Sequence, residues 1–126
     1  MEIKSPDRNY IEYVVVLAVV LVVSALVGAN IYYQRLGSKQ KALYYELQMM
    51  RTGINLFKVV EKRNPRNLTE LARGVYRFPG EDETKKYLSN VPFDGRGKLV
   101  DPFGNEFIYD YNTGWIRSVT SGYEMW

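Results

Sequence analysis

The N-terminal part of the chain carries a long uninterrupted apolar run. Residues 13–29 read YVVVLAVVLVVSALVGA, in which Ser24 is the one polar side chain and no charge occurs. Continued through residue 33, the run has about 21 residues, which as a helix rising roughly 1.5 Å per residue spans the roughly 30 Å of hydrocarbon in a bilayer. We therefore predict a transmembrane helix over residues 11–33, preceded by an N-terminal tail of residues 1–10.

The residues around the run favour a permanent anchor over a cleaved signal peptide, which is the main alternative. A signal peptide has a shorter apolar stretch followed by small residues, whereas the bulky sequence NIYYQR follows here. Tyrosines stand at both ends of the run, as in interfacial aromatic belts, namely Tyr10, Tyr13, Tyr32 and Tyr33. Basic residues are nearly balanced across the run, so charge alone leaves the orientation open: Lys4 and Arg8 precede it, and Arg35, Lys39 and Lys41 follow.

Helical periodicity continues beyond the apolar run, over residues 34–63. Apolar residues recur there at spacings of four, three, four and three, and we call this set the apolar stripe: Leu43, Leu47, Met50, Ile54 and Phe57. Polar residues occupy much of the remaining surface, so this half is amphipathic and needs something to cover its stripe. Gly37 and Ser38 are the one expected break or bend, and Pro65 ends the helix by disfavouring helical geometry at Asn64.

The remaining residues, 64–126, predict a small α/β head. Asn67 and Glu70 have the spacing of a capping box, in which the Asn67 side chain accepts from the Glu70 amide while Glu70 reaches back. A short helix should follow, with Leu68, Leu71 and Ala72 facing inward and an end near Gly74. Residues 83–88 are expected to form another helical turn, and residues 93–98 a flexible loop.

The C-terminal quarter predicts a β-hairpin. Residues 106–111 should place Phe107, Tyr109 and Tyr111 on one face, and residues 115–120 alternate with Ile116 opposite to Trp115, Arg117 and Val119, around a loop at residues 112–114. A two-stranded hairpin is marginal alone. It is stable if its apolar face covers the apolar stripe, so we predict an α+β fold in which the long N-terminal helix packs against a small antiparallel sheet.

The amino-acid composition excludes several kinds of functional site. The chain has no cysteine and no histidine, which rules out a disulfide, a thiolate metal site and the commonest general base. Its net charge of +3 comes from basic residues spread along the sequence, so nucleic acid is not an expected partner. No nucleotide-binding or catalytic signature is present, and we expect neither an enzyme nor a small-molecule substrate.

One acidic group raises the question of calcium, namely Asp94, Asp101, Glu106 and Asp110. Calcium takes six to eight oxygens from a folded loop, and this spacing matches no known loop pattern. Asp94-Gly95 and Asp101-Pro102 read better as turn formers. We therefore predict no cofactor.

Several segments together resemble the type IV pilins and type II secretion pseudopilins. The stretch 10–16, YIEYVVV, is similar to the isolated glutamate that opens the family's apolar helix, and the proline after residues 54–64 is similar to the end of that helix. The most specific segment is 99–109, LVDPFGNEFIY, with the turn Asp101, Pro102, Phe103, Gly104 and Asn105 before an aromatic strand. Ser121 and Gly122 are similar to the family's closing Ser-x-Gly segment.

The resemblance implies a structural role and a pilin-like fold. The apolar helix would store the subunit in the bacterial inner membrane with its C-terminal domain in the periplasm, and then pack against other pilin-like subunits or copies of itself in a filament. Glu12 would pair with a neighbouring subunit, typically at its N-terminal amine, and so set the register. From the residues alone, Glu12 could equally lie at headgroup level beside Arg8, one turn earlier.

The sequence lacks some features of the pilin and pseudopilin family, and their absence leaves a second functional hypothesis open. Counting back from Glu12, Asp7 stands where family precursors carry the glycine of the processing site, and Arg8 stands where the mature chain usually begins with an aromatic residue. A calcium-binding C-terminal loop is not recognisable in the closing SGYEMW. The alternative is a membrane-tethered binding or scaffold subunit of a cell-envelope complex that does not polymerise.

Overall fold

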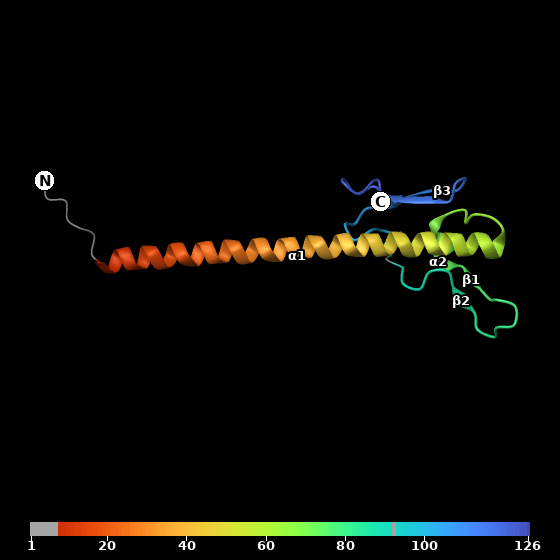
Figure 1. Ribbon diagram of the computed structural model, residues 1–126, viewed down its shortest axis with the longest axis horizontal. Helices are drawn as coiled ribbons and strands as arrows, with labels where there is room; N and C mark the ends of the chain where they lie inside the picture. Colours follow the sequence, from red (N-terminus) through yellow and green to blue (C-terminus); the bar gives the residue numbers. More distant parts are fainter. Residues whose placement is uncertain (1–7, 92) are drawn as a thin grey trace. The chain divides into compact units, whose positions relative to one another are not determined.

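The computed structural model describes residues 8–91 and 93–126 (Figure 1). The chain divides into two compact units, Met1–Ser38 and Lys39–Trp126, each described by itself below. The predicted α+β fold, a long N-terminal helix with a small C-terminal antiparallel sheet, is confirmed. Helix α1 is Arg8–Glu61, and it has no break at Gly37 or Ser38, where a bend was expected.

The first unit consists, among its described residues, of the N-terminal part of α1. Helical geometry already includes residues 8–10, which the sequence pattern assigned to the tail, because neither proline nor glycine interrupts this segment. The part of the predicted tail at residues 1–7 lies outside the described residues. The single polar side chain of the apolar run is satisfied internally, since the Ser24 hydroxyl donates to the Val20 carbonyl at 2.8 Å.

In the second unit, helix α2 (Leu68–Arg73) begins at a cap that was largely predicted. The Asn67 side chain accepts from the Glu70 amide at 2.8 Å. The Glu70 carboxylate, however, accepts from the Arg66 amide, not from that of Asn67. The reason is Arg63, whose guanidinium binds Glu70 at 2.6 Å, draws it toward the end of α1 and holds its pKa below the usual range. Gly74 ends α2, as expected.

Two small antiparallel sheets complete this unit. Strand β1 (Val75–Tyr76) pairs with β2 (Lys85–Lys86), and β3 (Phe107–Asp110) pairs with β4 (Trp115–Ser118). The helical turn expected at residues 83–88 is therefore wrong. Extended backbone there brings Tyr87 onto Phe57, with ring centroids 4.9 Å apart, and this packing outweighs local helix propensity.

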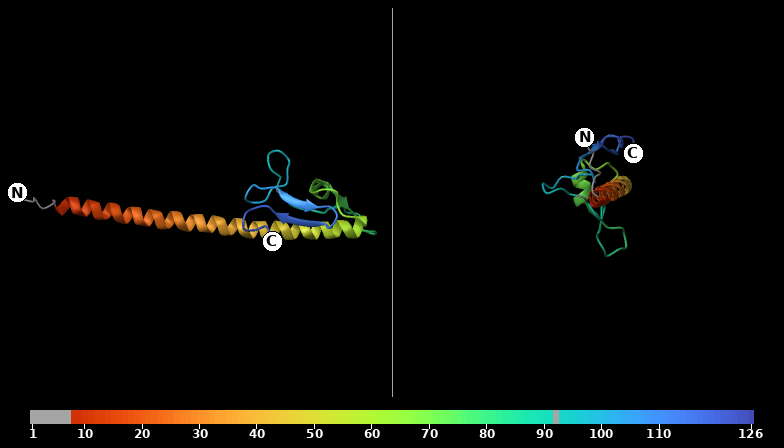
Figure 2. Two further views of the ribbon diagram at one scale, coloured as in Figure 1. Left: turned by 90° about the horizontal axis from the view of Figure 1, so that it is seen from above. Right: turned by 90° about the vertical axis from the view of Figure 1, so that its left-hand side faces the viewer.

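The hairpin confirms the predicted alternation over most of its length. Ile116 and Ser118 are buried, while Trp115 and Arg117 lie on the outer face. Tyr111 belongs to the loop, which spans residues 111–114, and it is exposed instead of sharing the inner face. Figure 2 shows the hairpin alongside the second half of α1.

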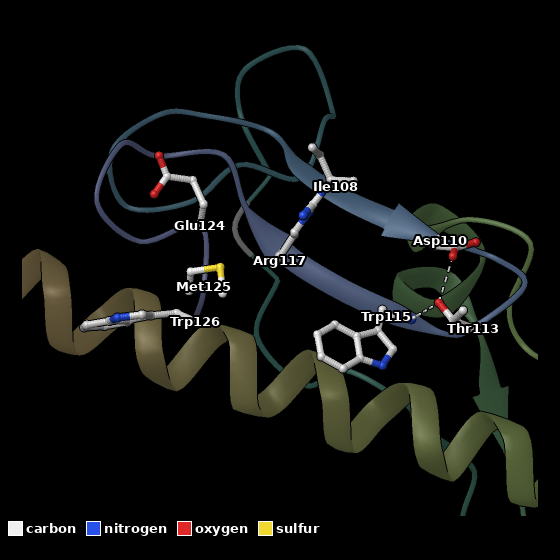
Figure 3. A pocket seen from close by; sticks show the side chains of 8 residues that line it. All are labelled: Ile108, Asp110, Thr113, Trp115, Arg117, Glu124, Met125 and Trp126. Carbon is white, nitrogen blue, oxygen red and sulfur yellow. Dashed lines mark hydrogen bonds between the residues drawn. The ribbon is translucent and has the colours of Figure 1, made fainter.

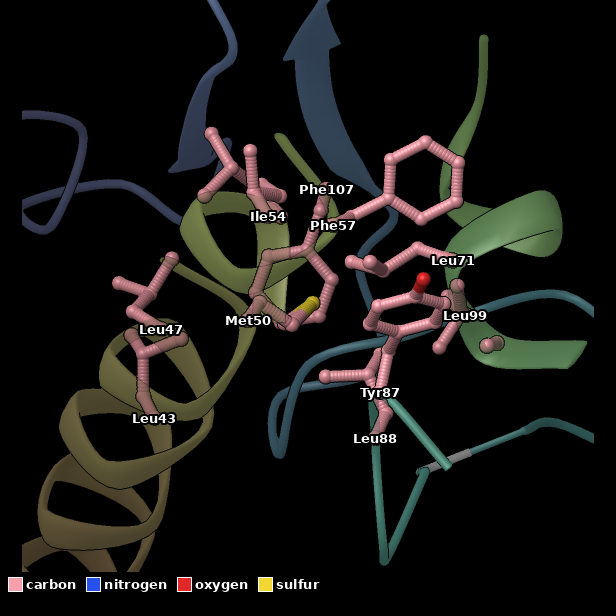
Figure 4. Close-up of a cluster of buried hydrophobic side chains, with 12 residues drawn as sticks. Leu43, Leu47, Met50, Ile54, Phe57, Leu71, Tyr87, Leu88, Leu99 and Phe107 are labelled. Atoms are coloured by element: carbon pink, nitrogen blue, oxygen red, sulfur yellow. The ribbon is translucent and has the colours of Figure 1, made fainter. Parts of the chain in front are cut away.

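The core is built on the apolar stripe (Figure 4). Its five residues are each at most 3 % exposed. The residues that cover the stripe come from α2, the β2 segment, the stretch before β3 and the hairpin, namely Leu71, Ala72, Tyr87, Leu88, Leu99, Phe107 and Ile116. Burial of this one face holds the head on α1.

Gly53 provides a test of how tightly the β2 segment sits on α1. A Cβ at this position would lie 2.7 Å from a Leu88 methyl carbon and 3.1 Å from the Tyr87 carbonyl oxygen. We expect Gly53→Ala to lower the free energy of unfolding by about 1 kcal/mol, because overpacking outweighs the helix propensity that alanine adds. The matched control is Gly37→Ala on the same helix, where a Cβ meets nothing within 4 Å and should be neutral or stabilising. Denaturant unfolding of both variants measures the difference, and equal stability would contradict the close packing.

Candidate functional site

The largest exposed feature of the first unit is the surface of the apolar run. Among the described residues, one helix is long and apolar enough to cross a membrane, and no residue of its most apolar stretch is buried. Leu17, Leu21 and Leu26 are each more than 60 % exposed. Apolar surface of this extent is unfavourable in water, and the helix that carries it is long and apolar enough to cross a membrane.

Glu12 lies at the start of this surface and is exposed. It makes no ion pair or hydrogen bond with any described residue of the chain. The alternative partner, Arg8, has a side chain outside the described residues. A carboxylate next to so much apolar surface is unfavourable unless it is paired or hydrated.

The second unit brings the predicted turn onto α1. Asp101 is buried, with Pro102 and Phe103 half-buried and Gly104 and Asn105 exposed. The turn closes through a 2.8 Å bond from the Asp101 amide to the Asn105 carbonyl, and Gly104 takes the positive φ of 88° that the pattern anticipated. Phe103 stacks on Tyr123 and lies under the Lys39 ammonium, 5.6 Å from the ring centroid.

The Asp101 carboxylate accepts hydrogen bonds from two separate segments of this region. One oxygen accepts from the amides of Phe103 and Asn105, each at 2.9 Å. The other accepts from the Ser118 hydroxyl at 3.0 Å and from the Thr120 hydroxyl. At 4 % exposure, this carboxylate accepts four hydrogen bonds, two of which lie within the turn and two of which tie the turn to the end of β4.

Glu46 was not predicted as part of any site. It lies on α1 between apolar-stripe residues, and one of its carboxylate oxygens is buried without a hydrogen-bond partner among the described residues. Burial, together with the nearby charge of Asp101, raises its pKa to about 7. Its position between Leu43 and Leu47 was the available signal, but its burial depends on the distant turn that packs over α1.

The acidic residues considered for calcium do not converge. Asp94 accepts from the amides of Arg96 and Lys98, at 2.8 Å each, inside its own turn. Glu106 pairs with Lys98, and Asp110 accepts from Thr113 at 2.9 Å. Among residues 8–91 and 93–126, no three metal-ligating side chains gather. Each of these carboxylates instead fixes a local turn or strand contact.

Comparison of the chain with protein-family models, with curated proteins and with solved structures finds no match. The functional interpretation therefore rests on the molecule itself. It has two separate candidate surfaces: the exposed apolar run with Glu12 at its start in one unit, and the head in the other. Contacts fix the Asp101 turn and the apolar stripe internally, so these residues build the head, whereas the apolar run remains uncovered.

Proposed function

We propose that this chain is a structural subunit of the pilin and pseudopilin type, which acts by packing its apolar helix against others and not by catalysis. The observation that carries the proposal is that no described residue of the chain covers the apolar run. Such a helix is stable in lipid as a stored monomer and equally stable against apolar helices of other subunits. We place it in a bacterial inner membrane with the head in the periplasm, as part of a type II secretion or type IV pilus assembly.

The architecture of the head supports the same proposal. The amphipathic half of α1 buries its apolar stripe under the hairpin and the Asp101 turn, so the head has its own core and does not need the apolar run for stability. The apolar run is thus free to exchange lipid for neighbouring helices. Glu12, with no partner among the described residues of its own chain, would pair with a cationic group of the adjacent subunit and fix the axial register.

Helix–helix packing can be tested by cysteine cross-linking in membranes, because the natural chain contains no cysteine. Single cysteines at Ala18, Val19, Val20 and Leu21 cover every face of one helical turn. We expect oxidation to give disulfide-linked dimers from at least one of these positions. Adding Glu12→Ala to that variant should lower the cross-linked fraction about tenfold, since a pair at the edge of lipid loses its charged partner.

The control for this experiment is Glu83→Ala, which removes an exposed glutamate of the head and should leave cross-linking unchanged. Both variants should show the same unfolding transition as the parent, because neither residue belongs to the core. Absence of dimers from all four positions would rule out a helical assembly. Wild-type cross-linking by the Glu12 variant would rule out the register role alone.

The second candidate is a membrane-tethered scaffold that does not polymerise. The observation in its favour is the sequence at the expected processing site, where Asp7 stands in place of glycine. Mass spectrometry of the mature protein separates the two candidates. Loss of the first seven residues with a methylated amine supports a filament subunit, whereas an intact Met1 together with no cross-linking supports the tether.

A further inference from the structure

Two adjoining pockets flank the hairpin of the head. One has a volume of about 510 Å³ and lies on the outer face of the hairpin (Figure 3); the other, of about 470 Å³, reaches toward α1. They share Thr113, Trp115, Met125 and Trp126. Volumes in this range suit a small organic ligand or one to two rings of a larger one.

Trp115 presents an unoccupied aromatic face to these pockets. Its side chain is 73 % exposed, and among the described residues neither another ring nor a cation stacks on it. Strand alternation forces it outward, because Ile116 and Ser118 fill the inner positions of β4. Trp126, by contrast, is held edge-on between Tyr44 and Tyr123, with centroids 6.2 Å and 4.8 Å away.

Polar groups with spare hydrogen-bonding capacity line the first pocket together with Trp115, with Asp110 and Glu124 toward opposite ends and Arg117 between them (Figure 3). Asp110 is fixed by bonds from the Asn112 amide and the Thr113 hydroxyl, both 2.9 Å, and each oxygen retains a free lone pair. Glu124 accepts from the Gly122 amide at 2.9 Å, which leaves its second oxygen available. Arg117 forms no hydrogen bond or ion pair with a described residue, so its five donors face the pocket unused.

The same geometry disfavours a peptide ligand. Strand addition needs free amides and carbonyls along a sheet edge, but Ile116 and Ser118 of β4 are each only 1 % exposed. An apolar helix in the groove would bury Arg117 beside two carboxylates without supplying polar partners, and such desolvation is unfavourable. A ligand that combines an apolar face with several hydroxyl groups fits these side chains.

We propose that this pocket binds a pyranose ring of a glycan. The C–H face of one ring would stack on the electron-rich face of Trp115, and hydroxyls of this ring and of adjoining rings would bond to Asp110, Arg117 and Glu124. Hydroxyls both donate and accept, so a glycan of more than one ring serves the carboxylates and the guanidinium together. This inference does not depend on the proposed assembly, since all of these residues belong to the head.

The test uses the full chain, ¹⁵N-labelled and held in an amphipol, which has no sugar head group to compete. The chain has two tryptophans, so the two indole N–H signals are assigned with a single Trp115→Phe variant. Maltotriose, cellotriose and tri-N-acetylchitotriose are titrated separately. We expect at least one of them to shift the Trp115 indole and the Arg117 side-chain signals in a saturable manner.

The variants then locate the site. Trp115→Ala should weaken binding at least about tenfold, and Arg117→Gln by several-fold, because each removes one named contact. The matched control is Tyr45→Ala, which removes an aromatic ring that is 68 % exposed on α1 and lines neither pocket. No shift with any trisaccharide would overturn the proposal. So would equal binding by Trp115→Ala, or saturable shifts with trilysine but with no sugar, which would assign the pocket to a cationic peptide.

Discussion

Replacing Asp101 by alanine is expected to lower the free energy of unfolding of the head by about 2–4 kcal/mol, the range for losing charge-assisted hydrogen bonds at a buried site. The substitution removes an acceptor shared by four donors. Ser118 is 1 % exposed, so its hydroxyl gains no water when its partner disappears. The orphaned donors, more than the lost packing, account for the size of the effect.

Two further variants separate the contribution of the Asp101 hydrogen bonds to stability from that of its negative charge. Asp101→Asn keeps one oxygen for the amides of Phe103 and Asn105, and the hydroxyls of Ser118 and Thr120 can turn to accept from its amide group. We expect it to lose less than half of the stability that alanine loses. Asp110→Ala is the matched control, because that exposed carboxylate serves only its own hairpin loop. Denaturant unfolding monitored by tryptophan fluorescence gives all three values.

The same four bonds determine what the result means for the fold. If Asp101→Ala unfolds at the same denaturant concentration as Asp110→Ala, the Asp101 carboxylate does not hold the turn to the end of β4. If the free energy of unfolding falls by the expected amount, hydrogen bonds from residues 101–105 hold the hairpin in place over the apolar stripe. The side chains of Phe103 and Tyr123 stack with ring centroids 5.4 Å apart next to this turn, and in Asp101→Ala they should lose order together.

The parts of the fold that follow from local periodicity were predictable from the sequence. A spacing near 3.6 placed the apolar stripe on one face of α1, and a spacing of two placed Ile116 and Trp115 on opposite faces of the hairpin. The turn at residues 101–105 could be predicted because proline and glycine favour known turn geometries. These elements depend on residues close together in the chain, so their pattern is complete in the sequence.

The parts that depend on distant partners were not predictable. Strands β1 and β2 have two residues each, too few for a recognisable alternation, and they exist because Tyr87 packs between Phe57 and Tyr76. In the same way, Glu70 accepts from Arg66 because Arg63, from the end of α1, pulls the carboxylate toward itself. A single sequence gives no signal for such contacts, which arise only when separate segments meet.

Glu46 is the clearest case, and it leads to a prediction about pH. Helical periodicity assigns it to the polar side of α1, but the Asp101 turn covers it, and its pKa rises from 4.5 to about 7. In the unfolded chain this carboxyl releases its proton near its ordinary pKa. Between pH 4.5 and pH 7 the folded state therefore holds more protons than the unfolded state, so stability falls as pH rises across this window and is constant on either side.

The expected size of the fall follows from the same difference. A change of this magnitude corresponds to about 3 kcal/mol if it is fully expressed, and partial exposure of the side chain reduces this to about 2 kcal/mol. Glu46→Gln should be more stable than the natural chain by that amount at pH 8 and nearly equal to it at pH 4. Glutamine has no proton to lose, and its amide can donate toward Asp101.

Thermal and denaturant unfolding of both proteins across this pH range measures the prediction. Asp82→Asn is the control, because this exposed residue has no hydrogen-bond partner among the described residues and should leave the pH profile of the natural chain unchanged. Parallel profiles for Glu46→Gln and the natural chain would show that Glu46 is hydrated in solution. A profile that flattens in Glu46→Gln, and also in Asp101→Asn, would show that the two carboxyls are coupled, so that one proton on α1 stabilises the closed turn of the head.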